Sequence, residues 1–225
     1  MSSNLTLNEL LEGCKGAIPP SVTPEEIKCS VAFTGYRPSK LPFGDDYESK
    51  KAIVLKLGLY NVVDRLMRKN YRYFMNGGAM GSDLLAAEAV IDVKKDNKRL
   101  GKYITNYFCL PCHDHTKQWT QKEKNRLEAL MNESSICFYV SDKPYYSGCM
   151  QVRNKYMVDT ADVLVAVYDG KPGGTHNTVE YAKKRNKKII IINPNLEVFI
   201  EFIDDLEDLD FKHRIFDSLI TEYGF

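Results

Sequence analysis

The fold is decided by a stretch that begins Val163-Leu164-Val165-Ala166-Val167-Tyr168 and continues, after Asp169-Gly170, as Lys171-Pro172-Gly173-Gly174-Thr175-His176-Asn177-Thr178-Val179-Glu180. The apolar run is typical of a buried parallel strand, and the polar residues after the Gly-Gly turn are typical of a helix start. Helix starts carry unpaired N–H groups and partial positive charge, which attract anions. We therefore expect phosphate binding at this turn, by Gly173, Gly174, Thr175, Asn177 and Thr178.

The same order of strand and helix extends over most of the chain. Apolar runs predict strands at 29–34, 71–75, 103–110, 135–140, 163–168 and 188–192. Apolar residues at the helical period predict helices at 47–69, 82–95, 117–131, 150–160 and 178–185. Such alternation favours parallel strands joined by right-handed crossovers. We expect an α/β fold: a Rossmann-like, doubly wound, mainly parallel sheet flanked by helices, with ligands beyond the carboxyl ends of the strands.

The domain organisation follows from the two ends of the chain. Residues 1–28 combine a short leucine-bearing helical pattern with a proline-rich run, Pro19-Pro20 and Pro24, and are interpreted as an N-terminal extension. Residues 29–225 are expected to form a single domain, closed by an amphipathic helical segment at 196–223. Its apolar stripe, Phe199, Phe202 and Ile203, predicts a homo-oligomer, because a small sheet leaves such a stripe uncovered.

Composition limits the classes of function. The 225 residues are 44% hydrophobic and 27% charged, with a formal net charge of +1, which disfavours a nucleic-acid partner. No stretch reaches the roughly 20 apolar residues of a membrane span, so no membrane partner is expected. The polar start of the chain does not resemble an export signal. We therefore expect a cytoplasmic protein whose six cysteines are free thiols.

A second glycine turn, Asn76-Gly77-Gly78-Ala79-Met80-Gly81-Ser82-Asp83, follows the second expected strand. It matches the dinucleotide-binding pattern except that Asn76 replaces the first glycine. Because no acidic residue ends the next strand, at Leu110-Pro111-Cys112, a dehydrogenase is disfavoured. One interpretation is phosphate or ribose binding by Gly77, Gly78, Ala79, Gly81, Ser82 and Asp83. The alternative is that Ser82 and Asp83 only cap a helix.

Two further segments carry candidate ligand contacts. Gly35-Tyr36-Arg37 leaves the first strand, where Arg37 is either a forked phosphate ligand or a solvated surface residue, and Tyr36 or the Tyr145-Tyr146 pair can stack on a base. Arg153 lies beside the apolar stripe of its expected helix. Buried guanidinium groups need a counter-charge, and the candidates are Glu180, Asp162 or a bound ligand.

Glu180 has two interpretations. With Asn177 as the N-cap, Asn177-Thr178-Val179-Glu180 is close to a capping box. Alternatively, its carboxylate is a catalytic base or stabilises a developing ribosyl cation, with Arg153 as the second catalytic residue.

Two other patterns are read as structural. Cys109-Leu110-Pro111-Cys112-His113, followed by His115, matches a haem-attachment string, but its first cysteine falls inside a strand. We therefore expect no metal site and no cofactor, although His113 and His115 can line the ligand crevice. The basic run 183–188 is typical of a solvated helix end.

Several motifs together resemble the YpsA-like branch of the SLOG superfamily. They are Gly35-Tyr36-Arg37-Pro38, Gly77-Gly78-Ala79-Met80-Gly81-Ser82-Asp83, Lys143-Pro144-Tyr145, Tyr156-Met157-Val158-Asp159 and Gly173-Gly174-Thr175-His176-Asn177-Thr178-Val179. The resemblance covers about Ser30 to Pro194. It implies a Rossmann-like sheet that binds a nucleotide derivative, as in the Lonely Guy phosphoribohydrolases, the DNA-processing protein DprA and nucleotide-sensing domains of this superfamily.

The Lonely Guy pattern is matched in order by Arg153, Met157, Asp162, Pro172, Gly173, Gly174, Thr178 and Glu180. The turn has one extra residue before Thr178, lacks the third glycine, and has Tyr181 where those enzymes carry a second glutamate. The leading hypothesis is therefore binding of a nucleoside phosphate, an ADP-ribose- or NAD-related molecule or a cyclic nucleotide signal. The alternatives are hydrolysis of the N-glycosidic bond of a nucleoside 5′-monophosphate, and single-stranded DNA binding like that of DprA.

Overall fold

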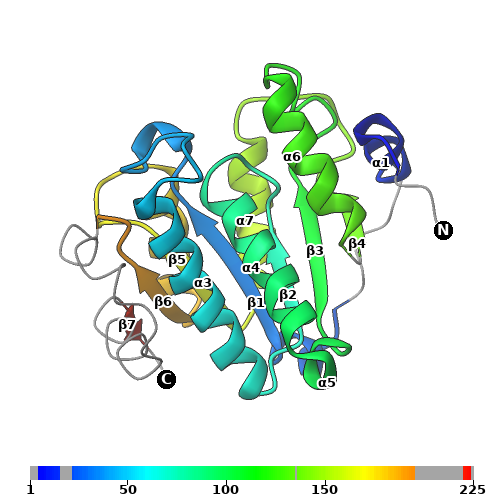
Figure 1. The fold of residues 1–225 in the computed structure, drawn as a ribbon. Coiled ribbons are helices and arrows are strands. Elements are labelled where there is room, and N and C mark those ends of the chain that lie inside the picture. Colours follow the sequence, from blue (N-terminus) through cyan, green and yellow to red (C-terminus); the bar gives the residue numbers. More distant parts are fainter. Residues whose placement is uncertain (1–4, 16–21, 135, 196–219, 224–225) are drawn as a thin grey trace.

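The computed structural model describes residues 5–15, 22–134, 136–195 and 220–223. At its centre is one sheet with the strand order β4-β3-β2-β1-β5-β6-β7 (Figure 1). The strands are β1 (Ser30–Gly35), β2 (Tyr73–Asn76), β3 (Thr105–Leu110), β4 (Ile136–Tyr139), β5 (Val163–Val167), β6 (Lys188–Ile192) and β7 (Ile220–Tyr223). β1 to β6 run parallel and β7 is antiparallel to β6, which confirms the predicted fold class.

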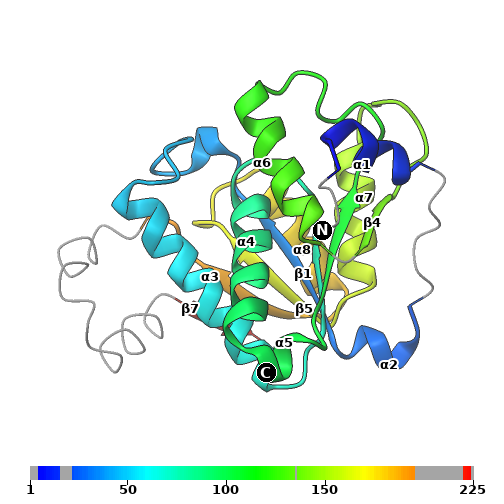
Figure 2. The same cartoon turned by 45° about the vertical axis from the view of Figure 1, so that its right-hand side comes forward.

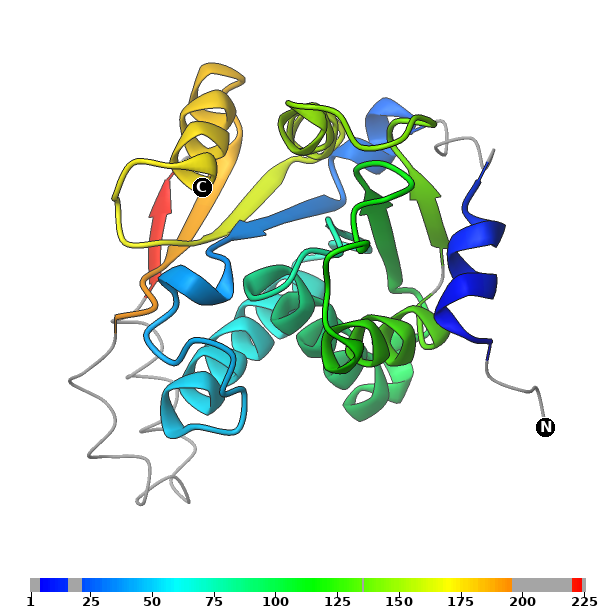
Figure 3. The ribbon, with the colours of Figure 1, turned by 90° about the horizontal axis from the view of Figure 1, so that it is seen from above.

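Helices cover both faces of the sheet (Figure 3). α3, α4 and α6 lie on one face, α7 and α8 lie on the other, and α4 packs between α3 and α6 (Figure 2). The helices are α1 (Leu7–Gly13), α2 (Pro24–Ile27), α3 (Lys50–Arg68), α4 (Ser82–Asp96), α5 (Lys98–Gly101), α6 (Gln121–Asn132), α7 (Cys149–Asp159) and α8 (Gly174–Lys184). No helix in the described ranges has both the length and the apolar content needed to cross a bilayer.

The course of the chain creates a topological switch point between β1 and β5. From β1 the chain moves outward through β2 and β3 to the edge strand β4, and then returns to β5 on the other side of β1. The segments that leave β1 and β5 therefore diverge to opposite sides of the sheet. In open α/β sheets, this divergence leaves a crevice beyond the carboxyl ends of the strands, where ligands bind.

The core is built from the residues that the two periodicities predicted. All five residues of β5 are buried, as expected for a strand covered on both faces. On α3, Leu55, Leu59, Val62 and Leu66 recur at helical spacing and are buried against the sheet.

Gly35, at the end of β1, has no room for a side chain. A Cβ placed there would lie 2.4 Å from Ser82 Cβ and 2.9 Å from Val167 Cβ. We therefore expect Gly35→Ala to lower the free energy of unfolding by about 1–3 kcal/mol, the usual cost of overpacking. Urea denaturation measures this loss. Gly58→Ala is the matched control. Gly58 lies inside α3, and the atom nearest to its added Cβ is Ile192 Cγ2, 3.9 Å away, so this change should be neutral or stabilising.

Helix α1 packs against α6, near the edge strand β4. The main-chain N–H of Leu7 donates to Glu128 of α6, 2.7 Å away, and Leu7 is buried. This contact brings Cys14 within 5.7 Å, Cα to Cα, of Cys137 in β4, and the two form a disulfide. The expectation of six free thiols is thus wrong for this pair. Sequence spacing gave no sign of it, because 123 positions separate the two residues.

Three of the sequence interpretations fall wholly or mostly on residues outside the described ranges. The proline pair Pro19-Pro20 lies there, and so does the apolar stripe from which self-association was inferred. Most of the expected C-terminal helical segment, 196–219, also lies there, whereas its last residues form β7 rather than a helix.

Candidate functional site

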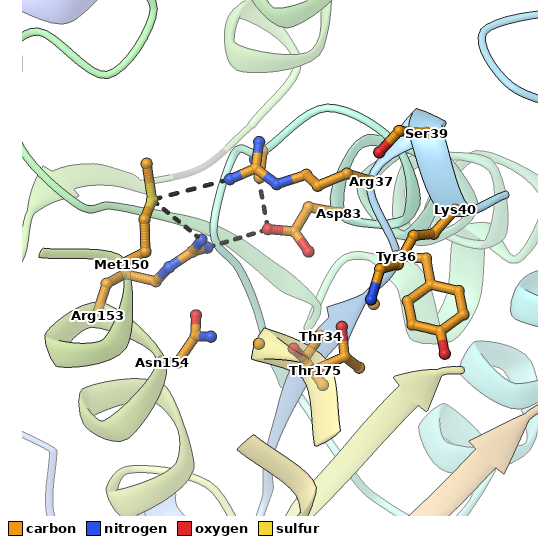
Figure 4. Close-up of a pocket in the computed structure, with 13 residues that line it drawn as sticks. Thr34, Tyr36, Arg37, Ser39, Lys40, Asp83, Met150, Arg153, Asn154 and Thr175 are labelled. Atoms are coloured by element: carbon orange, nitrogen blue, oxygen red, sulfur yellow. Dashed lines mark hydrogen bonds and ion pairs between the residues drawn. The ribbon is translucent and has the colours of Figure 1, made fainter. Parts of the chain in front are cut away.

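A pocket of about 200 Å³ opens at the switch point (Figure 4). Its wall is formed by the segment after β1, the turn before α4, the first turns of α7 and the N-terminus of α8. The lining residues are Thr34, Gly35, Tyr36, Arg37, Ser39, Lys40, Ala79, Asp83, Met150, Arg153, Asn154, Gly174 and Thr175. The structure thus brings together eight of the sixteen predicted site residues: Gly35, Tyr36, Arg37, Ala79, Asp83, Arg153, Gly174 and Thr175.

The pocket carries an excess of positive charge. Arg153 and Asp83 form a buried ion pair, with 3.0 Å between Arg153 Nη1 and Asp83 Oδ2. Arg37 lies beside them; burial lowers the pKa of its guanidinium, Asp83 raises it, and the neighbouring charge of Arg153 lowers it. Lys40 also lines the wall. The lining therefore holds three cationic side chains and one carboxylate, an excess of positive charge that favours an anionic ligand.

The partner of Arg153 differs from those expected. Neither Glu180 nor Asp162 binds it: Asp162 accepts hydrogen bonds from Tyr71 Oη and Lys188 Nζ. Asp83 lies 70 positions before Arg153 and reaches it from the first turn of α4. Arg153 Nε is buried with no hydrogen-bond partner in the described structure, so one donor of this guanidinium remains available.

The N-terminus of α8 faces the pocket without a side-chain cap. The described helices α1, α2, α3 and α6 begin with a Thr or Ser that accepts a main-chain N–H. By contrast, α8 follows Gly173, with no capping side chain and no acidic residue in its first turn. Because the first N–H groups of a helix have no intrahelical acceptor, Gly174 and Thr175 present free donors at the pocket wall.

The helix start also corrects a prediction. α8 begins at Gly174, whereas the sequence predicted Thr178 with Asn177 as its cap. Gly173, at φ 152°, takes a conformation that suits glycine and turns the chain into the helix earlier. The capping box of Asn177 and Glu180 is therefore wrong. Asn177 is exposed, and Thr178 accepts a hydrogen bond of 2.9 Å from Asn154 Nδ2, which ties α8 to α7.

The second glycine turn directs its main-chain donors at the protein itself. The N–H groups of four residues have protein acceptors: Gly78 donates to Asn76 Oδ1, Ala79 to Asp83 Oδ2, Gly81 to Tyr47 Oη and Ser82 to Tyr36 O. A Cβ on Gly77 would lie 0.6 Å from Arg153 Nη1. The observed arrangement of this turn makes room for the Arg153 guanidinium and orients Asp83 toward it.

Tyr36 and Glu180 have partners that direct them away from a ligand. Tyr36 is buried, and its hydroxyl donates to Asp169. Hydrogen bonds from Lys171 and Tyr36 hold the pKa of Asp169 well below its usual range, although partial burial acts to raise it. Glu180 pairs with Lys183, 2.8 Å away on the same helix, and this hydrogen bond lowers the pKa of its carboxyl group. Glu180 does not line the pocket described above.

Five lining residues were not among the predicted binding residues: Thr34, Ser39, Lys40, Met150 and Asn154. Lys40 is held over the pocket by a hydrogen bond from its Nζ to Pro172 O, 3.2 Å away. Met150 Sδ accepts contacts from Arg37 Nη2 at 3.8 Å and Arg153 Nη2 at 4.0 Å. Two of these residues could have been predicted from their positions relative to Arg153. Asn154 follows it directly, and Met150 lies one helical turn before it.

The loop after β3 adds a buried histidine near this charge cluster. His115 Nδ1 lies 3.0 Å from Cys112 O, whereas His113 pairs with Asp142. Burial lowers the pKa of His115 to about 4, against the effect of the hydrogen bond to Cys112, and the charges of Arg153 and Arg37 lower it further. His115 is therefore neutral at physiological pH. Its neighbour Cys112 is a protonated thiol, because burial and the Cys149 thiol 3.6 Å away raise the pKa of Cys112 to about 12.

This histidine makes stability depend on pH. The unfolded chain binds a proton at His115 below about pH 6.5, whereas the folded protein resists protonation until about pH 4. Stability should therefore fall as the pH drops through this window. The loss at His115 is expected to be on the order of 2–3 kcal/mol by pH 4.5. Urea denaturation at pH 7 and 4.5 should show a smaller drop for His115→Asn than for the wild type; equal drops would contradict the assignment.

The part of the chain that holds this site matches a known protein family. Residues 31–196 match the sequence profile of the YpsA SLOG family. The SPbeta prophage-derived protein YoqJ of Bacillus subtilis (strain 168) is 34% identical over 142 residues, 58% of this chain and 81% of the relative. YpsA of the same organism is 24% identical over 160 residues, 70% of this chain and 86% of the relative.

A solved structure, DNA processing protein A from Helicobacter pylori, shares the fold. Its TM-score is 0.50 at 15% sequence identity, and the match covers 96% of this chain and 95% of that one. The family match spans the sheet from β1 to β6 together with both glycine turns and the pocket between them. The chain belongs to the YpsA SLOG family.

Proposed function

We propose that the switch-point pocket binds a nucleotide-derived small molecule through its phosphate and ribose. The observation that carries this proposal is the buried Arg153–Asp83 ion pair with the half-buried Arg37 guanidinium beside it, in the same pocket wall as the uncapped N-terminus of α8. An excess guanidinium and free main-chain N–H groups are the donors that phosphate prefers. A neutral ligand would leave both without compensation.

The contacts expected for a nucleotide follow from the side chains present. The phosphate is expected against Arg37, whose Nη2 contacts the weak acceptor Met150 Sδ, and against the N–H groups of Gly174 and Thr175. Arg153 already pairs with Asp83 and adds its free Nε donor. The hydroxyls of Thr34 and Ser39 and the amide of Asn154 are neutral polar groups of the kind that bind ribose hydroxyls.

Binding is favoured over hydrolysis because of Glu180. A glycosidic hydrolase needs a carboxylate at the reacting carbon, and the carboxylate expected in that role pairs with Lys183 outside the pocket lining. Chromatography of AMP incubated with the protein tests the alternative. Release of free adenine by the wild type but not by Glu180→Gln would favour the hydrolase.

The affinity for nucleotides tests the proposal. We expect calorimetry to detect binding of at least one of AMP, ADP-ribose, NAD or a cyclic dinucleotide. Arg37→Gln should weaken that binding about 30- to 150-fold, because a charged donor to phosphate is worth about 2–3 kcal/mol. Arg68→Gln on the outer surface of α3 is the matched control and should leave affinity unchanged. Uniform absence of binding to a folded sample would refute the proposal.

Single-stranded DNA belongs in the same panel. The solved structure from Helicobacter pylori is described by its single-stranded DNA binding mode. The formal net charge of +1 in this chain argues against such a partner, because phosphate contacts by many basic residues dominate that affinity. Salt-sensitive binding of an oligodeoxythymidine, unaffected by Arg37→Gln, would replace the small-molecule proposal with DNA binding.

A further inference from the structure

A second cavity, of about 590 Å³, lies next to the switch-point pocket, in which the phosphate is proposed to bind. The two share Arg37 and Met150 in their walls, so these side chains stand between one pocket and the other. The remainder of the second wall comes mainly from the loop after β3 and from the loop before α7, with His115, Trp119 and Tyr145 as its ring-bearing residues. The switch-point pocket offers no exposed aromatic ring among its lining residues, because Tyr36 is buried and its hydroxyl donates a hydrogen bond to Asp169.

His115, in the wall of this cavity, carries an unused hydrogen-bond acceptor. Its Nδ1 lies 3.0 Å from Cys112 O, and since a carbonyl oxygen only accepts, Nδ1 carries the hydrogen. Nε2 therefore holds a lone pair. This atom is buried and has no hydrogen-bond partner in the part of the chain that the structure describes, while the residue as a whole is 8% exposed. Buried acceptors are usually paired, so an N–H or O–H donor at this atom would be stabilising.

The aromatic side chains around His115 supply a stacking surface. Trp119 meets the imidazole edge-on, with ring centroids 5.8 Å apart, and Tyr145 is 62% exposed at the cavity. Flat heteroaromatic groups stack on such rings, and the stacking contributes more binding free energy than the burial of apolar surface area alone. A planar group that also carries an N–H donor on its edge satisfies both features of the cavity.

We propose that this cavity binds the base of the nucleotide whose phosphate occupies the first pocket, and that His115 Nε2 accepts a hydrogen bond from an exocyclic amino group of that base. This inference rests on the proposed function and adds the class of ligand: an amino-bearing base such as adenine. His115 is then the residue that sets base specificity, while Arg37 binds the phosphate.

Ligands that differ in one group test the inference. AMP and purine riboside 5′-monophosphate differ only by the amino group, and ribose 5-phosphate lacks the base altogether. We expect wild-type protein to bind AMP at least tenfold more tightly than purine riboside 5′-monophosphate. Trp119 is the only tryptophan in the sequence, so its fluorescence should change with either base-bearing ligand and stay constant with ribose 5-phosphate.

Variants on one loop provide the matched comparison. His115→Asn keeps a donor for Cys112 O, but its shorter side chain has no acceptor at the position of Nε2, so it should bind AMP and purine riboside 5′-monophosphate equally. His113→Asn, two residues away and paired with Asp142, should discriminate like the wild type. Equal binding of the two ligands by wild type, which needs no variant to fold, overturns the inference. If ribose 5-phosphate also binds in that case, the proposed function stands without the base contact. If none of the three ligands binds, the proposed function fails as well.

Discussion

Asp83→Ala is expected to lower the free energy of unfolding by about 3–5 kcal/mol, the usual cost of removing one partner of a buried ion pair. The Asp83 and Arg153 side chains are only 6% and 4% exposed, and Arg37 lies beside them. Without the carboxylate, the buried Arg153 guanidinium and the half-buried Arg37 guanidinium lie together with no counter-charge. The N–H of Ala79 also loses its acceptor.

Urea denaturation measures this effect, and two comparisons isolate its cause. Asp64→Ala removes the partner of Arg68 in an exposed ion pair of 2.7 Å and should cost less than about 1 kcal/mol. Adding Arg153→Met to Asp83→Ala should restore part of the lost stability, because one of the uncompensated charges is then gone. A loss for Asp83→Ala no larger than that for Asp64→Ala would show that the cluster is not a coupled charge site.

Gly77→Ala is the second change with a large expected effect. The added methyl group would occupy the position of Arg153 Nη1, so the guanidinium must leave Asp83. We expect a stability loss on the order of 3 kcal/mol from the broken buried pair. Nucleotide affinity should fall at least as much as in Arg37→Gln, because the displaced side chain enters the pocket.

Urea denaturation measures the loss of stability in Gly77→Ala, and calorimetry measures the loss of nucleotide affinity separately. Gly58→Ala adds the same methyl group inside α3, where the nearest atom is 3.9 Å away, and should preserve both stability and affinity. Native stability together with native nucleotide affinity in Gly77→Ala would mean that Arg153 is not held as described.

The fold was predictable because the sequence contains both the continuous apolar runs of buried strands and the apolar spacing of amphipathic helices. Continuous apolar runs such as 163–168 and the helical spacing of Leu55, Leu59 and Leu66 have one reasonable interpretation each. The glycine turns were also readable, since parallel strands put their ends at one edge of a sheet. Positions of Gly35, Arg37, Gly174 and Thr175 at one pocket follow from that rule alone.

Pairings across the sheet were not predictable. Asp83 reads as an ordinary first-turn acid, and nothing local indicates that it neutralises a guanidinium 70 residues later. Likewise, the second glycine turn reads as a phosphate site, whereas its space is filled by Arg153 and its N–H groups bind protein acceptors. The true start of α8 was hidden because an uncapped helix lacks the very side chain by which helix starts are recognised in a sequence.

A structure of the protein crystallised with AMP, at a concentration above its measured dissociation constant, tests the central claim most directly. The account predicts the phosphate within hydrogen-bond distance of the Arg37 guanidinium and of the Thr175 N–H, at the carboxyl ends of β1 and β5. A phosphate bound at any other surface of the molecule, with the switch-point pocket empty, would contradict it.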